Sequence, residues 1–115
     1  MKIALISLNQ AWEDKEKNLN SCLEFINKAS EQEVDLIIFP EMTLTGFSTN
    51  IKNIAEDELE SEAIKSFSTM AKSHSVAIIF GVVIKEEGNK ASNRAYFLDN
   101  LGLIQASYKK SGRCQ

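Results

Sequence analysis

The sequence alternates three short apolar segments with two stretches that have the spacing of amphipathic helices. The apolar segments cover residues 2–8, 34–40 and 76–84, and their β-branched content predicts buried strands. Residues 14–30 and 57–73 carry apolar side chains at helical spacing. Because strands that alternate with helices pair in parallel and pack against those helices, the pattern restricts the chain to an α/β fold.

The second half of the chain follows a different pattern. Residues 41–56 read as a polar loop and residues 88–92 as a turn, while segments 94–99 and 103–109 flank a turn at Asn100–Gly102. Two short strands around such a turn predict an antiparallel meander. The predicted order is therefore β-α-β-α-β-β-β, which disfavours a flavodoxin-like domain, since that fold would continue the β-α alternation. No helix is predicted after the last strand, so the sheet looks unfinished.

Composition excludes several classes of function. The 115 residues are 43% hydrophobic and 25% charged, with a net charge of -3, which suits a single globular domain or part of one. A mildly acidic chain is a poor match for nucleic acid or an anionic membrane surface. No apolar run has the length of a membrane span, and the first residues turn polar too soon for a secretory signal. We therefore expect a cytoplasmic protein.

A carboxylate stands directly after the second apolar segment, in the stretch DLIIFPEMTLTGFS (residues 35–48). Pro40 ends the predicted strand, and Glu41 follows it. Ligands of α/β proteins bind beyond the carboxyl ends of parallel strands, and a carboxylate beside apolar side chains can serve as a general base. The residues alone leave two interpretations open for Glu41: a catalytic base, or an ordinary glutamate on a surface loop.

Several motifs in order strengthen the catalytic interpretation. They are PEMTLTGFS (40–48), IIFGVVIKE (78–86), SNRAYFLDNLGLI (92–104) and SYKK (107–110). Together they resemble the nitrilase-type carbon–nitrogen hydrolases, and the ending TGFS is similar to the ω-amidase-like branch. The resemblance covers residues 1–110, whereas residues 111–115 diverge. It implies that residues 1–115 form an incomplete hydrolase domain, the N-terminal part of an α-β-β-α sandwich with one mixed sheet and two helices.

The resemblance also implies a chemistry. The family hydrolyses non-peptide C–N bonds of small amides or nitriles with a glutamate, a lysine and a cysteine. Carried over to this sequence, Glu41 is the general base. Within the pattern of a tyrosine, a basic residue and the catalytic lysine, Tyr108, Lys109 and Lys110 match, so Lys110 is the oxyanion-stabilising lysine. The residues alone allow a blander alternative, a solvated basic end of an edge strand. The family further implies a possible homo-oligomer.

The match fails at the nucleophile. The family places a histidine two residues after the lysine, where this chain has Gly112, and its cysteine lies further downstream. Cys22 falls on the apolar face of the first predicted helix, and Cys114 lies in the tail, so neither is a candidate. His74 suits a surface or capping role, and Trp12 is predicted to be a partly buried packing residue.

Two hypotheses follow from this pattern. The first is a carbon–nitrogen hydrolase whose missing cysteine leaves the chain inactive alone. The alternative is a non-catalytic truncated fragment that acts as a binding or interaction module through its uncovered strands. We expect no cofactor, no metal, no nucleic acid and no membrane partner in either case.

Overall fold

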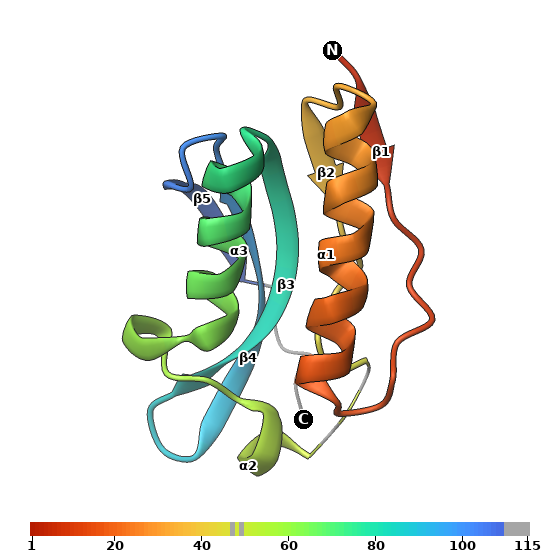
Figure 1. Ribbon diagram of the computed structural model, residues 1–115. Helices are drawn as coiled ribbons and strands as arrows, with labels where there is room; N and C mark the ends of the chain where they lie inside the picture. Colours follow the sequence, from red (N-terminus) through yellow and green to blue (C-terminus); the bar gives the residue numbers. More distant parts are fainter. Residues whose placement is uncertain (47, 49, 110–115) are drawn as a thin grey trace.

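The computed structural model describes residues 1–46, 48 and 50–109, and it is an α/β fold with one mixed sheet (Figure 1). Its elements are β1 (Ile3–Leu5), α1 (Lys15–Glu31), β2 (Leu36–Ile38), α2 (Ile51–Ile54), the 3-10 turn η1 (Glu58–Glu60), α3 (Glu62–His74), β3 (Ala77–Glu86), β4 (Lys90–Leu98) and β5 (Ile104–Lys109). The five strands lie in the order β1-β2-β3-β4-β5. The predicted fold class is confirmed.

The sheet changes direction at β3. Strands β1, β2 and β3 pair in parallel, whereas β3, β4 and β5 pair antiparallel. The β3–β4 turn is tighter than the predicted 88–92 and occupies residues 87–89, because Lys90 already pairs with Glu86. Gly88 and Asn89 both have positive φ angles, of 68° and 60°, which is the left-handed conformation that tight hairpins require.

Both long helices begin at polar caps. The Asp14 side chain accepts a hydrogen bond from the Lys17 N–H, so α1 starts where the sequence predicts. The predicted second helix starts too early, since α3 begins only at Glu62. The reason is that Ser61 has an extended backbone and caps α3 through the Ile64 N–H.

The core lies between the sheet and these two helices. Ring centroids of Phe67 and Phe80 are 4.3 Å apart, and those of Phe80 and Tyr96 are 5.8 Å apart, so aromatic side chains connect α3 to β3 and β4. Cys22 is fully buried in the same core, and burial raises the pKa of its thiol to about 12. The predicted packing role of Cys22 is confirmed. The prediction for Trp12 is wrong, because its loop holds the side chain 67% exposed.

The opposite face of the sheet is much more open. Figure 1 shows α1 and α3 on one face only. Large apolar side chains on the other face are exposed, including Leu5 at 77% and Tyr108 at 68%. All six residues of β5 are exposed, in agreement with the prediction of an uncovered last strand. None of the helices in the described residues has the length and apolarity that crossing a bilayer requires.

Candidate functional site

Glu41 lies at the carboxyl end of β2, where the chain leaves the parallel part of the sheet. The Phe39 N–H still donates to the Ile79 carbonyl at 2.9 Å, and Pro40 then interrupts the pairing since it has no N–H. Residues 41–45 form a tight turn, in which the side chain of Glu41 is exposed. The sequence therefore places this carboxylate correctly at a strand end.

The turn is attached to the middle of β3 through Thr43 and Gly81. The Thr43 hydroxyl donates to the Pro40 carbonyl at 2.6 Å and accepts from the Gly81 N–H at 3.0 Å. The Thr43 N–H donates to the Gly81 carbonyl at 3.1 Å. A Cβ atom on Gly81 would lie 2.7 Å from the Met42 nitrogen and 3.0 Å from the Glu41 Cα. Only glycine lets the backbone that carries Glu41 approach β3 this closely.

Two side chains from the N-terminal part of the chain fasten the same turn. The Asn18 amide of α1 donates to the Leu44 carbonyl at 2.7 Å, and the Gln10 amide donates to the Met42 carbonyl at 3.0 Å. The first part of the predicted loop 41–56 is a turn, although residues 42–46 are buried. The prediction is wrong for its second part, which contains the short helix α2 (Ile51–Ile54). Polar groups of the turn are buried because neighbouring segments satisfy their hydrogen bonds.

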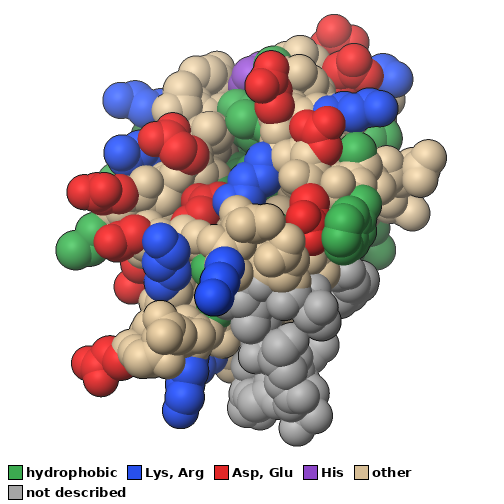
Figure 2. All heavy atoms as spheres, turned by 90° about the horizontal axis from the view of Figure 1, so that it is seen from below, with side chains coloured by type: hydrophobic (Ala, Val, Ile, Leu, Met, Phe, Trp, Pro, Cys, Tyr) green, Lys and Arg blue, Asp and Glu red, His purple; other side chains and the backbone are tan. Residues whose placement is uncertain are grey.

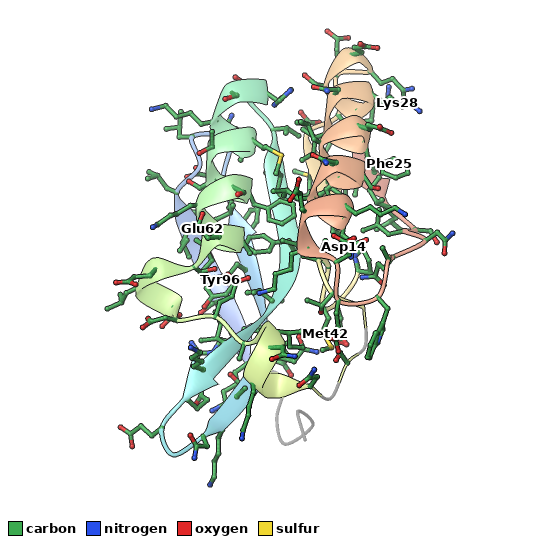
Figure 3. All side chains as sticks on the ribbon, turned by 60° about the horizontal axis from the view of Figure 1, so that its bottom comes forward. Asp14, Phe25, Lys28, Met42, Glu62 and Tyr96 are labelled. Carbon is green, nitrogen blue, oxygen red and sulfur yellow. The ribbon has the colours of Figure 1, made fainter. Side chains whose placement is uncertain are left out.

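The segment that follows the turn, which includes α2, packs against the C-terminal half of β3. Met42 contacts Ile54 and Val83 in a small apolar cluster, and Figure 3 shows Met42 beside α2. Within this segment Glu56 forms an ion pair with Lys15 of α1 at 2.8 Å. Burial by itself raises the pKa of Glu56. Hydrogen bonds from Lys15, from the Ser61 hydroxyl and from the Ala63 N–H lower this pKa by more than burial raises it, so the net pKa lies below the ordinary value.

A hollow of about 190 Å³ opens beside Glu41 on the open face of the sheet. The residues that define it include Phe39, Glu41, Ile79, Gly81, Ala95 and Tyr108. Ala95 and Tyr108 are paired across β4 and β5, so the hollow joins the turn after β2 to the last strand. The structure thus brings the predicted base and the tyrosine of the lysine motif to one cavity, although 66 residues separate them in the sequence.

Lys109 points away from this hollow. Its ammonium donates to Glu86 Oε1 at 2.9 Å, and Glu86 also accepts from Arg94 and from the Ser92 hydroxyl. Lys109, Arg94 and Ser92 together hold the pKa of Glu86 at about 2. The other predicted lysine, Lys110, lies outside the described residues, as do Cys114 and the rest of segment 111–115.

The remaining candidates do not join the site. His74 binds the Met70 carbonyl and the Asn27 side chain, at 3.0 and 2.6 Å, and so connects α3 to α1. This position agrees with the predicted capping role. Among residues 1–46, 48 and 50–109, no three His, Cys, Asp or Glu side chains lie close enough together to share a metal ion.

The sequence reasoning did not identify Gly81, Thr43, Asn18 and Gln10 as residues that position Glu41. For Gly81 the signal was present, because a glycine inside an otherwise apolar strand often marks a close backbone approach. The other three carry no such signal, since their partners are backbone carbonyl and N–H groups of distant segments.

Comparison with known proteins gives a consistent result. The family described as Carbon-nitrogen hydrolase matches residues 2–112. Among curated proteins, the chain is 28% identical to a glutamine-dependent NAD(+) synthetase of Acinetobacter baylyi over 95% of its own length and 20% of the relative. It is 26% identical to a 2-oxoglutaramate amidase of Bacillus subtilis, over 95% of this chain and 42% of the relative.

A solved structure agrees as well. A mutant of the Nesterenkonia AN1 amidase from the nitrilase superfamily matches with a TM-score of 0.87 and 25% identity, over 97% of this chain and 44% of that one. The chain therefore spans less than half the length of the proteins to which it is similar.

Proposed function

This chain belongs to the carbon-nitrogen hydrolase family, and we propose that it provides the glutamate base and the oxyanion lysine of an amidase-type active site. The observation that carries the proposal is the position of Glu41, on a turn fastened to β3 and beside a hollow that it shares with Tyr108. A base held by a rigid backbone needs little reorganisation when the reaction begins, which favours catalysis.

In the proposed reaction Glu41 accepts the proton of a cysteine thiol. The thiolate attacks the amide carbon, Glu41 returns the proton to the nitrogen so that ammonia leaves, and water then cleaves the thioester to give the carboxylic acid and the free thiol. Lys110 stabilises the negative charge that develops on the substrate oxygen. We assign the nucleophile to neither cysteine of the chain, because Cys22 is buried with a strongly raised pKa and Cys114 has no counterpart in the family motif.

The contacts of Tyr108 and Lys109 in β5 support the choice of Lys110 over Lys109 as the oxyanion lysine. Lys109 is engaged by Glu86, whereas Tyr108 lines the hollow beside Glu41. Lys109 is therefore committed to an ion pair away from the hollow, and the family pattern of a tyrosine, a basic residue and the catalytic lysine assigns the oxyanion role to Lys110.

Small amides are the substrate class that we propose first. The support is that the names of the similar proteins include a 2-oxoglutaramate amidase and an amidase of the nitrilase superfamily. Nitriles are the second class, on the family resemblance alone. A cytoplasmic location is part of the proposal, since a reducing compartment keeps a catalytic thiol available.

The test uses ammonia release from small amides. The 115-residue chain alone should give no turnover above background, and turnover by the pure chain would contradict our assignment of no nucleophile to it. A chimera that joins residues 1–110 to the remaining part of a related amidase should release ammonia. Glu41→Gln or Lys110→Met in the chimera should lower kcat by about 100-fold or more. The control Glu62→Gln, in the first turn of α3, should leave kcat unchanged. An active Glu41→Gln chimera would refute the role of Glu41.

A further inference from the structure

A buried asparagine that the proposed reaction does not use lines the hollow beside Glu41. Asn93 of β4 is only 8% exposed, and it is one of the residues that define the hollow. Its neighbours Ser92 and Arg94 turn to the opposite face of the sheet, where both donate hydrogen bonds to Glu86. Because side chains alternate along a strand, the side chain of Asn93 belongs to the open face.

The strand register places Asn93 close to the backbone of Glu41. Gly81, against which the Glu41 backbone packs, pairs with Ala95 across β3 and β4. Asn93 is the next residue of β4 on the same face as Ala95, about 7 Å further along the strand. A small molecule in the hollow can therefore contact Asn93 and Glu41 at once.

The side-chain amide of Asn93 is not used within the fold. Among the residues that the structure describes, none forms a hydrogen bond with this amide. Every fully enclosed side-chain nitrogen or oxygen atom of these residues does have a partner, so the amide of Asn93 still reaches the open space of the hollow. A buried amide without a partner is costly. Asn93 therefore keeps an acceptor and two donors available for a molecule in the hollow.

The hollow suits a small, uncharged molecule. Its volume of about 190 Å³ lies below the roughly 300 Å³ at which sites for drug-sized ligands begin, and its lining includes apolar Phe39, Ile79 and Ala95. Figure 2 shows the end of the molecule that carries α2, where acidic and basic side chains are interspersed. The surface in that view therefore gives no strong preference for a charged ligand.

We propose that Asn93 binds the carboxamide of the substrate, an inference that rests on the proposed function of the site. Oδ1 of Asn93 accepts a hydrogen bond from an N–H of the substrate amide, and this bond holds the leaving nitrogen on the side of the hollow that Glu41 shares. Esters and nitriles have no N–H at this place. Because a site built to hydrogen-bond a substrate N–H rejects analogues that lack it, Asn93 selects primary amides over both.

The test measures hydrolysis of acetamide by the chimera that joins residues 1–110 to the remaining part of a related amidase, with methyl acetate as the competing analogue. Asn93→Ala should lower kcat/KM for acetamide about 10-fold, as the loss of one hydrogen bond predicts. The inhibition constant of methyl acetate should change less than twofold, and the urea midpoint should stay the same because the amide has no partner in the fold. Asn20→Ala, at an exposed position of α1, is the matched control and should change none of these values.

Two outcomes would overturn the inference while the proposed function stands. Unchanged acetamide hydrolysis in Asn93→Ala would show that the amide does not bind substrate. Equal losses for acetamide and methyl acetate would show that Asn93 supports the site without recognising the amide.

A measurement without turnover separates the inference from the proposed function. If the unsubstituted chimera is inactive, the proposed function fails, and Asn93 is then judged in the 115-residue chain labelled with ¹⁵N-asparagine. A saturable shift of the Asn93 side-chain signals with acetamide, and none with methyl acetate, would support amide binding. No shift with acetamide would overturn it.

Discussion

The turn that carries Glu41 and the strand β5 that leads to Lys109 border the same hollow, but they are held in very different ways. Residues 42–46 of the turn are buried, and Thr43 is fully enclosed. By contrast, every residue of β5 is exposed, and within the part of the chain that the structure describes this strand pairs with β4 alone. One side of the candidate site is therefore built into the core of the sheet, whereas the other side rests on an edge strand.

The difference has a physical origin. Hydrogen bonds inside a buried region are costly to break, since a broken bond leaves polar groups without water. An edge strand can exchange its hydrogen bonds with water and frays more easily. We therefore expect changes in the turn to alter both stability and the position of Glu41, while changes in β5 should be tolerated.

The largest effect should come from Gly81→Val. The new side chain would collide with the backbone of Met42 and Glu41, and backbone cannot move aside as a flexible side chain can. We expect a loss of about 3 kcal/mol or more in the free energy of unfolding, measured by urea denaturation. Ala106→Val in the exposed strand β5 is the control and should change stability little. Equal stabilities for the two variants would refute the close approach at Gly81.

A smaller effect is expected for Thr43→Val. Valine has the same shape but leaves the Gly81 N–H and the Pro40 carbonyl without their partner, which should lower the free energy of unfolding by about 2 kcal/mol. Thr69→Val removes a hydroxyl that bonds to a carbonyl on the exposed surface of α3 and serves as the matched control. If both substitutions cost the same, the buried hydrogen bonds of the turn do not stabilise it.

The ion pairs at the end of β5 should appear in the pH dependence of stability. The pKa of Glu86 is held at about 2, below its ordinary 4.5, so the folded state favours the charged carboxylate. This contribution is complete above pH 4.5 and is lost as the pH falls from 4.5 to about 2. Glu86→Gln should flatten the decline in urea midpoint over that window. Glu24→Gln on α1 should not, and an unchanged slope in Glu86→Gln would contradict the ion pairs.

The smallest effect is expected for Tyr108→Ala. The tyrosine side chain is exposed on the open face, so its loss should change the free energy of unfolding by no more than about 0.5 kcal/mol. Thermal unfolding, monitored by circular dichroism, measures this change in the free energy of unfolding. A loss as large as that of Thr43→Val would remove the contrast between the two sides of the hollow.

Much of the fold follows from local patterns in the sequence. The order of the strands and the two long helices, the cap at Asp14 and the position of Glu41 after β2 are all predicted from spacing and residue type, because a buried strand or an amphipathic helix leaves its period in the chain. The four-residue helix α2 is too short to leave such a period and was not predicted. The later start of α3 and the exposure of Trp12 are not, since an extended Ser61 and the path of a loop depend on distant contacts.

The sequence by itself determined the α/β class, the family and the glutamate that we propose as the base. Only the tertiary structure decided that the polar turn after β2 is buried, that Gly81 admits it and that Lys109 points to Glu86. The reason is that these features join side chains to the backbone of segments far apart in the chain, and such partners leave no periodic signal.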